Sequence, residues 1–414
     1  MDIVLRILAP VGRAIRRIFN IGIPLKITLV LLILAVGGVY GWTSSSMMRA
    51  MGGKSDYDEA KRYIEIKDVV ENNFIDSVDR SAMGNSAAAA MISGLGDQWS
   101  SFMSADEYRT FQMSSANEYS GIGMSILKTP SGGFQITQVN PGSPAAWAGL
   151  GANMVIVAVD DVDVRGMDTD EVRTMIRSRL NKVFTLTIDG QKDPIKVDCS
   201  TTYVSPVSYK VDRTGAGIIT ISNFEAGSAE DSITAIETLL GQGVSGFVID
   251  LRNNPGGLVE EAHKLLDYLL PQGELFYSAT KNGKLDVYSS DNQCLKTNFR
   301  IIINNHTYSE AEVFANVMQE YQWAALVGET TSGKTRTQQT IELADGSAIR
   351  LSTKSYRTAG GRDISREGGV VPDTIIYNTV TESIDASFND GNGTASYNDD
   401  AQMREALRQL SMFY

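Results

Sequence analysis

Residues 246–258 read GFVIDLRNNPGGL, and this apolar run ending in a glycine turn decides the fold. A short apolar run with β-branched residues, bounded by turn residues, is typical of a strand buried on both faces. Further strands are expected at Ile218–Ile221 and Phe299–Asn304, with amphipathic helices at Ala229–Leu240, Leu258–Leu270 and Ser309–Tyr321. This alternation predicts crossover units on a largely parallel sheet, so we expect an α/β core at residues 206–384.

The rest of the chain divides by pattern into other regions. Residues 56–118 are largely helical in pattern, and residues 119–200 hold short strands (134–139, 155–159, 183–188) with two short helices. Inside the core, a hairpin is expected around Ala344-Asp345-Gly346, between strands 337–343 and 348–356. Residues 385–400 are rich in Asn, Asp, Gly and Ser and are predicted to be a linker before a C-terminal helix at 401–414.

Composition excludes several classes of function. The chain has 414 residues and a net charge of −12, whereas a protein that binds nucleic acid needs a dense basic face. It has only two histidines, His263 and His306, and two cysteines, Cys199 and Cys294, which match no metal-binding spacing. We therefore expect no nucleic-acid partner, no metal and no cofactor.

The N-terminal region has the pattern of a membrane anchor. Residues 21–43 are almost wholly apolar apart from Lys26, which approaches the length of about 20 residues that crosses a bilayer. Basic residues precede this span, namely Arg6, Arg13, Arg16 and Arg17. The positive-inside rule then keeps residues 1–20 in the cytoplasm and places the rest outside. A cleaved signal peptide is the alternative, although Ser44–Ser46 is a weak cleavage site.

Two short motifs suggest chemistry that their context does not support. Residues 328–335 read GETTSGKT, which fits the phosphate-binding loop pattern, but the residues that follow predict a hairpin strand rather than the required helix. Ser278-Ala-Thr-Lys281 fits the pattern of a serine and lysine on one helical turn. Because Asn282-Gly283 follows at once, a surface hairpin is the better interpretation.

Ser309 is the candidate nucleophile. It stands where an apolar strand ends and a helix begins, and both Thr307-x-x-Glu310 and Ser309-x-x-Glu312 fit the capping-box pattern. A serine there is usually a cap, but the same position offers free amides to a developing oxyanion. As the base, Lys334 is preferred to His306, provided that burial lowers the pKa of the amine.

These segments together resemble the carboxyl-terminal processing proteases of bacteria and chloroplasts. The resemblance rests on Asp250–Leu258, on Ser309-Glu310, on Gly333-Lys334 located 25 residues after Ser309, on Gly369-Val-Val-Pro-Asp373 and on Gly94–Ser104. It covers about Tyr57 to Ile376. It implies that Ser309 attacks the scissile carbonyl, that Lys334 takes its proton and that Gln338 orients Lys334. It also implies an oxyanion hole made by amides near Gly256 and Gly257 and by that of Glu310.

The resemblance also implies the overall organisation. A PDZ-like domain at 119–200 would bind substrate C-termini through the loop Gly121-Ile122-Gly123-Met124, inserted before a crotonase-like protease core. The expected protein is a single-pass extracytoplasmic serine endopeptidase that acts on proteins with accessible C-termini and could form a homodimer. Departures occur at His306-Thr-Tyr308, Thr335 and Gly151–Val155. They motivate the alternative of a catalytically dead, membrane-tethered PDZ adaptor.

Overall fold

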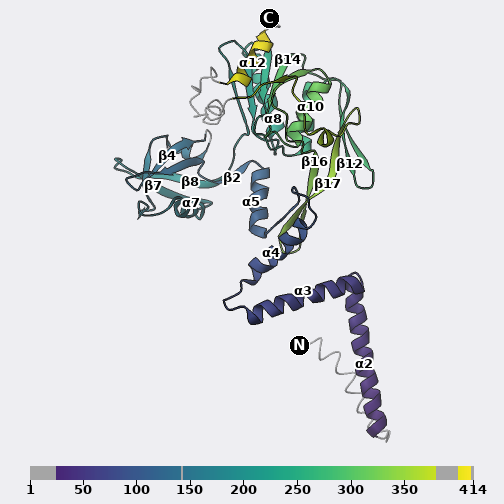
Figure 1. The fold of residues 1–414 in the computed structure, drawn as a ribbon. Helices are drawn as coiled ribbons and strands as arrows, with labels where there is room; N and C mark the ends of the chain where they lie inside the picture. Colours follow the sequence, from purple (N-terminus) through teal and green to yellow (C-terminus); the bar gives the residue numbers. More distant parts are fainter. Residues whose placement is uncertain (1–24, 141–142, 379–399, 412–414) are drawn as a thin grey trace. The chain divides into compact units, whose positions relative to one another are not determined.

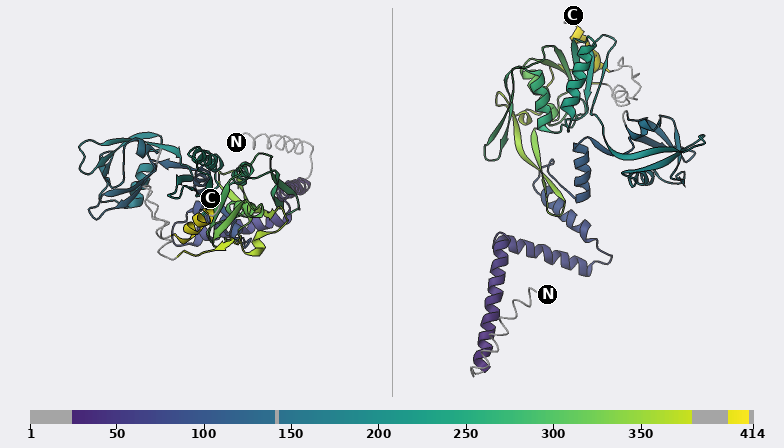
Figure 2. Two further views of the ribbon diagram at one scale, coloured as in Figure 1. Left: turned by 90° about the horizontal axis from the view of Figure 1, so that it is seen from above. Right: turned by 180° about the vertical axis from the view of Figure 1, so that it is seen from behind.

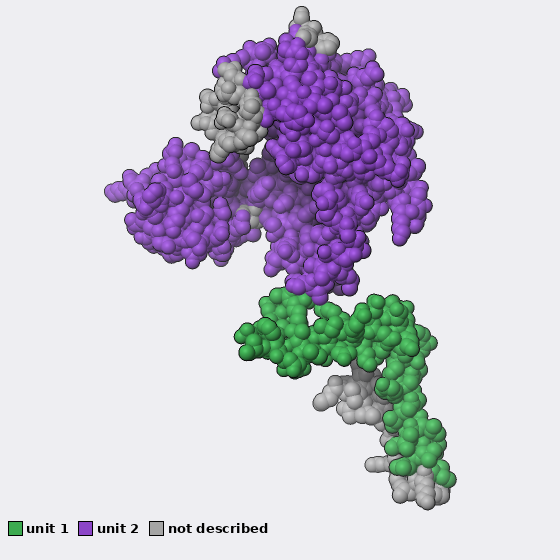
Figure 3. Space-filling view, viewed as in Figure 1, with its two compact units in different colours: residues 1–84 green, residues 85–414 purple. Residues whose placement is uncertain are grey.

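The computed structural model describes residues 25–140, 143–378 and 400–411. The chain forms two compact units, residues 1–84 and 85–414, which Figure 3 shows in different colours. The predicted tail at 1–20 and the predicted linker at 385–400, except Asp400, lie outside the described residues. The division into further domains within the second unit stays a prediction.

Two long helices make up most of the described part of the first unit. Helix α2 (Leu25–Ala50) contains a stretch, Leu29–Ala50, that is long and apolar enough to cross a membrane, and the side chains of that stretch are not buried in the protein. The helix continues beyond the predicted end of the span at residue 43, since Ser44–Ser46 do not interrupt it. Gly52 and Gly53, both with positive φ, separate α2 from helix α3 (Lys54–Asn73), which has no buried residues.

The predicted helical region contains more than helices. Helices α4 (Arg80–Ser93) and α5 (Ala105–Ser115) agree with the pattern, and Ser104 caps α5 through a capping box with Glu107. Between them lies the three-residue strand β1 (Ser101–Met103), which pairs antiparallel with strand β17 (Ala348–Thr358). This strand was not predicted, because its partner is more than 240 residues away.

Residues 118–203 form a seven-stranded sheet with two helices. The elements are β2 (Glu118–Gly121), β3 (Met124–Lys128), β4 (Phe134–Val139), α6 (Pro144–Trp147), β5 (Val155–Val159), β6 (Val162–Asp163), α7 (Thr169–Arg177), β7 (Lys182–Ile188) and β8 (Ile195–Tyr203). Alternate residues of the strands, such as Phe134 and Ile136, are buried in one core with Val172 of α7. The three strands predicted here are confirmed, as β4, β5 and β7.

The α/β core is built on a six-stranded sheet. Its order is β18-β15-β14-β11-β10-β9, and only β9 is antiparallel to its neighbour. The strands are β9 (Val207–Val211), β10 (Gly217–Ile221), β11 (Gly246–Asp250), β14 (Asn298–Ile303), β15 (Ala324–Gly328) and β18 (Thr374–Ile375). Every residue of β11 is buried, as the run at 246–250 predicts.

Helices cover both faces of this sheet (Figures 1 and 2). One face packs against α8 (Ser228–Gly241), α9 (Val259–Leu269) and α10 (Glu310–Glu320), and the other packs against α12 (Ala401–Ser411). Neighbouring residues of one strand point to opposite faces, so Val248 contacts the α12 side and Ile249 the α8–α10 side. The sheet is therefore the middle layer of three.

A second, antiparallel sheet of five strands completes the core. It contains β1, β12 (Gly273–Thr280), β13 (Leu285–Ser290), β16 (Arg336–Glu342) and β17. Ser278 lies in β12 and Lys281 in the turn before β13, so the serine–lysine helical motif is absent here. Strand β16 follows the loop after β15, so no helix supports a phosphate-binding loop at 328–335. The hairpin of β16 and β17 is confirmed.

Candidate active site

Three loops leave the parallel sheet at the carboxyl ends of β11, β14 and β15, where binding sites of open α/β sheets are found. Hydrogen bonds join these loops to one another. The Asn253 N–H donates to Asn304 Oδ1 (3.0 Å), the Tyr308 N–H to the Asn254 carbonyl (2.9 Å) and the Ser332 N–H to the Thr307 carbonyl (3.2 Å). The segments that carry Gly256, Ser309 and Lys334 are thus fixed to each other.

Ser309 has an unusual backbone conformation. Its φ is 56° and its ψ is −120°, in a region that residues other than glycine rarely adopt. Such strain is kept only where the surroundings determine it, and it is common at functional sites. Ser309 is 2% exposed and precedes the first turn of α10, so this sharp turn between β14 and the helix sets the direction of its side chain.

The Glu312 carboxylate links the segments that carry Ser309 and Lys334. It is fully buried and accepts hydrogen bonds from the Ser309 N–H (2.8 Å), Thr331 Oγ1 (2.6 Å), Ser332 Oγ (3.0 Å) and the Gly333 N–H (2.6 Å). Burial raises the pKa of Glu312, while these hydrogen bonds oppose that shift. A single side chain therefore holds the backbone of Ser309 beside the loop that ends in Lys334.

Lys334 is half-buried, and its ammonium group lies over the Trp99 ring, 4.5 Å from the ring centroid. Burial lowers the pKa of Lys334, and Arg350 lowers it further, whereas Glu310, Glu312 and Asp97 raise it. The net direction is downward, which increases the fraction of neutral amine at neutral pH. This is the electrostatic condition that a lysine base requires.

The glycine turn at 256–257 lies directly against Ser309. A Cβ atom on Gly256, whose φ is 91°, would stand 2.8 Å from Ser309 Cβ, and one on Gly257 would stand 2.3 Å from the main-chain carbon of Phe224. Only glycine allows so close an approach. The Gly256 N–H donates to Asn254 Oδ1 (2.8 Å), so this predicted oxyanion donor has an acceptor within its own turn.

The Glu310 side chain accepts the hydrogen bond of the second predicted oxyanion donor, the Gly257 N–H. Its Oε2 accepts from the Gly257 N–H (3.1 Å), and its Oε1 accepts from the Tyr356 hydroxyl (2.7 Å). The residue is 4% exposed, so this carboxylate is held in the interior of the site. In this conformation, the amide of Gly257 already binds an anionic oxygen that belongs to the chain itself.

Gln338 and His306, the two other side chains considered for catalysis, make no hydrogen bond to Ser309 or Lys334 among the described residues. The Gln338 side-chain amide donates to the Arg336 carbonyl (2.7 Å) and lies 3.5 Å from Ser352 Oγ, and no hydrogen bond joins it to Lys334 among the described residues. His306 is exposed, and its Nδ1 lies 3.5 Å from the Tyr308 hydroxyl. The orienting role of Gln338 and the choice of Lys334 over His306 as the base both stay predictions.

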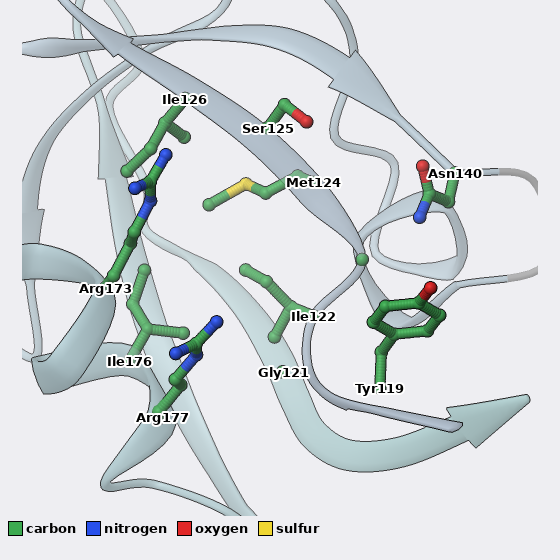
Figure 4. Close-up of a pocket in the computed structure, with 11 residues that line it drawn as sticks. Tyr119, Gly121, Ile122, Met124, Ser125, Ile126, Asn140, Arg173, Ile176 and Arg177 are labelled. Atoms are coloured by element: carbon green, nitrogen blue, oxygen red, sulfur yellow. The ribbon is translucent and has the colours of Figure 1, made fainter. Parts of the chain in front are cut away.

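The loop Gly121–Met124, predicted to bind substrate tails, lines a groove of the sheet at 118–203 (Figure 4). This groove lies between strand β3 and helix α7. Among the described residues, no group of three or more His, Cys, Asp or Glu side chains could hold a metal ion. Cys199 and Cys294 are both free thiols.

Sequence reasoning missed the roles of Glu312 and Trp99. The spacing of Ser309 and Glu312 indicates a capping box, but the three donors at 331–333 become visible only when the loops meet. Trp99 lies in the segment Gly94–Ser104, which contributes to the family resemblance. No local sequence pattern indicates that its ring covers the amine of Lys334, 235 residues later. The Trp99 ring also makes a T-shaped contact with the Tyr308 ring, with ring centroids 6.1 Å apart.

Comparisons with known proteins agree with these two regions. The pattern of peptidase family S41 matches residues 215–376, and that of the PDZ domain matches residues 135–189. Both matches lie inside the predicted ranges, 206–384 and 119–200.

Two relatives and one solved structure align with most of the chain. A carboxyl-terminal-processing protease of Picosynechococcus is 30% identical over 299 residues, which cover 70% of this chain and 72% of the relative. One from Synechocystis is 29% identical over 300 residues, covering 70% of each chain. The solved structure of a photosystem II D1 C-terminal processing protease aligns with a TM-score of 0.46 at 23% identity, over 82% of this chain and 92% of that one.

Proposed function

Because this chain belongs to the carboxyl-terminal-processing proteases of peptidase family S41, we propose that it cleaves proteins through an acyl-enzyme on Ser309, with Lys334 as the base. The chain is a serine-type peptidase, and a PDZ domain in such an enzyme implies protein substrates. The observation that supports this dyad best is the Glu312 carboxylate, which binds the backbone of Ser309 and the loop of Lys334 at once.

The proposed reaction starts with the neutral amine of Lys334. Ser309 Oγ bonds to the scissile carbonyl carbon while its proton passes to Lys334 Nζ. The C–N bond then breaks, and the departing amine takes that proton. Water next attacks the acyl-enzyme, with Lys334 again as the base, which releases the acid and restores the hydroxyl of Ser309.

The negative oxygen of the tetrahedral intermediate needs donors beside Ser309. We assign the Glu310 N–H and the Gly256–Gly257 turn to this role, and Gln338 to orienting Lys334. The Gly257 N–H now donates to Glu310 Oε2, so this carboxylate must leave before that amide can bind an oxyanion. Glu310 thus supplies one donor through its backbone and competes for another through its side chain.

Cleavage of an unstructured protein by the full chain in detergent micelles tests the nucleophile. We expect Ser309→Ala to lose activity at least about 10⁴-fold, as for other serine nucleophiles, and to lose labelling by an active-site serine phosphonate. Ser131→Ala, which changes an exposed serine of the PDZ-like region, is the matched control. Retained cleavage by Ser309→Ala would exclude it as nucleophile, and wild-type protein that neither cleaves nor is labelled would favour the dead adaptor.

The base is tested separately. We expect Lys334→Ala to lose activity by a similar factor, with the fold intact by circular dichroism. His306→Ala should keep its activity, because His306 is exposed and contacts Tyr308 instead. The reverse result would make His306 the base.

We also propose that α2 anchors the protein in the membrane with the crotonase-like protease core and the PDZ-like domain outside the cytoplasm. The apolar stretch Leu29–Ala50 and the arginines that precede the span in the sequence support this orientation. Retention in the membrane after alkaline extraction, with the core digested by protease added outside, is the expected result. Release of a shortened soluble chain would indicate a signal peptide. The homodimer stays a prediction, which the mass of the detergent-solubilised protein tests.

A further inference from the structure

We propose that the groove between β3 and α7 selects protein tails that carry an acidic side chain at the third residue from the C-terminus, position −2, opposite Arg173. This inference rests on the proposed function, since it names the substrate class of the tail-binding domain. Of the residues that the structure describes, eleven line the groove, and among these only Arg173 and Arg177 have charged side chains. Nothing in the family resemblance predicts these arginines.

The glycine loop fixes the end of the groove where a terminal carboxylate would bind. The Ile122 carbonyl accepts from the Ala145 N–H (2.8 Å), and the Gly123 carbonyl accepts from the Asn140 N–H (2.9 Å). In a trans peptide group, the N–H points opposite to the C=O. The N–H groups of Gly123 and Met124 therefore point away from Ala145 and Asn140, and two adjacent amides of this kind suit an anionic oxygen.

The floor of the groove accepts an apolar last residue. Ile122, Ile126 and Ile176 line it, and each is nearly buried within the domain. Such a floor selects an apolar side chain at position 0, whose carboxylate reaches the loop. The chain direction of the tail is thereby set along β3.

The two arginines form one wall of the groove. They stand four residues apart on α7, so their stems are separated by about 6 Å along the helix axis. In Figure 4, Arg177 lies toward Gly121 and Ile122, and Arg173 lies farther along the groove toward Ile126. Helix α7 itself is held by its buried residues Val172 and Ile176, so the wall has a fixed place in the domain.

The spacing of the wall matches an extended peptide. Residues two apart in a strand point to the same side and are about 6.6 Å apart, close to the separation of the two arginines. A tail whose last residue lies beside Arg177 therefore presents its position −2 side chain to Arg173, while position −1 points away. Arg173 forms an ion pair with Asp170 (3.2 Å), and this pair is weak because both side chains are exposed to solvent. The guanidinium can therefore exchange Asp170 for an acidic side chain of a bound tail.

Isomeric peptides provide a sharp test. Two short fluorescent peptides end in Glu-Ser-Leu or Ser-Glu-Leu, so they share composition and net charge and differ only in whether Glu occupies −2 or −1. Binding is measured by anisotropy on the full chain in detergent, with Ser309→Ala keeping the peptides intact. We expect the peptide with Glu at −2 to bind about two- to fivefold tighter than its isomer, a typical effect of one partly exposed ion pair.

Variants of Arg173 test whether this residue causes the preference for Glu at position −2. Arg173→Ala should abolish the preference, Arg173→Lys should keep it, and Arg173→Glu should favour a peptide with Lys at −2. Arg165→Ala, which removes the same charge outside the groove, is the matched control and should change nothing. Equal binding of the isomers, or a preference that survives Arg173→Ala, would overturn the proposal.

Peptides with an amidated C-terminus separate this inference from its premise. Amidation should weaken binding at least tenfold if the loop holds a terminal carboxylate. Equal binding of the amide would refute tail recognition and, with it, the assignment to Arg173. Cleavage by Ser309 is measured on its own and does not depend on either result.

Discussion

Two glycine turns of this chain present main-chain amides to the place where an anionic oxygen is expected, and they differ in their surroundings. At Gly121–Gly123, the carbonyls of Ile122 and Gly123 accept hydrogen bonds from the rest of the domain, and two arginines flank the groove. At Gly256–Gly257, the Gly257 amide already donates to the buried Glu310 carboxylate. The first turn is open to an anion from another protein, whereas the second holds one supplied by its own chain.

This difference suits a turn that binds a stable group and one that binds a transient charge. A substrate carboxylate is permanent, so added positive charge strengthens its binding. An oxyanion exists only during the reaction, and donors are most useful there when they are fixed in place beforehand. The Glu310 carboxylate keeps the Gly257 N–H oriented before a substrate arrives, at the cost of having to be displaced.

Among the variants that compare the two turns, Gly256→Ala should have the largest effect. The added methyl group would stand 2.8 Å from Ser309 Cβ, so it displaces the nucleophile or the turn. We expect cleavage of an unstructured protein to fall about 100-fold or more, as when an oxyanion donor is lost, while tail-peptide binding is unchanged. Gly215→Ala is the matched control, because Gly215 has a similar φ of 87° and no atom near the added Cβ. Equal losses in both variants would show that backbone strain alone is responsible.

At the Gly121–Gly123 turn, the substitution that corresponds to Gly256→Ala is Gly123→Ala. Its methyl group would stand 2.3 Å from Ser143 Cβ, which forces the loop and its amides to move. We expect tail-peptide binding to weaken at least tenfold and cleavage of a substrate with an amidated C-terminus to be unchanged. Gly149→Ala, also at positive φ but with open space around the added Cβ, should bind normally. Unchanged binding by Gly123→Ala would remove the loop from tail recognition.

Glu310→Gln tests whether the Glu310 carboxylate blocks the Gly257 N–H from binding an oxyanion. A neutral amide is a weaker acceptor than a carboxylate, so the Gly257 N–H should become easier to recruit, and activity should rise by up to about tenfold. Burial lowers the pKa of Lys334 and Glu310 opposes this shift, so removing its charge should lower that pKa further. The rising limb of the pH–activity profile should then move to lower pH. Reduced activity at every pH would instead make the Glu310 carboxylate part of the catalytic machinery.

The last prediction concerns stability rather than activity or binding, at Glu225, which follows Phe224 beside the Gly256–Gly257 turn. Burial raises the pKa of Glu225 to about 7, with Arg350 opposing and Glu310 adding to the shift. The folded state thus binds more protons than the unfolded state between about pH 4.5 and 7, so this group lowers the free energy of unfolding as the pH rises through that range. A rise of the pKa from 4.5 to about 7 corresponds to a loss of up to about 3 kcal/mol, at about 1.4 kcal/mol per pKa unit. We expect Glu225→Gln to remove this loss, measured by urea denaturation at several pH values. Glu237→Gln, at an exposed helical position, should keep the wild-type profile.

The sequence predicts those parts of this fold whose causes are local. Strand β11 is visible because burial on both faces demands a continuous apolar run, and the β16–β17 hairpin because Asp345-Gly346 favours a turn. The pairing of β1 with β17, the Trp99 ring over Lys334 and the Glu310 carboxylate on Gly257 join residues far apart in the chain. No local pattern encodes such contacts. The local pattern at Ser309 fits an ordinary helix cap as well as a nucleophile, and the family resemblance supports the second interpretation.

The Glu312 carboxylate has a consequence for protein engineering. Because its two oxygens receive the Ser309 N–H and three donors of residues 331–333, the helix start and the loop cannot be exchanged independently. Grafting a foreign loop that lacks the hydroxyls of Thr331 and Ser332 would leave a buried acid short of donors and loosen the segment that carries the nucleophile. Chimeras between related enzymes should therefore inherit the α10 start and the 331–333 loop from the same parent.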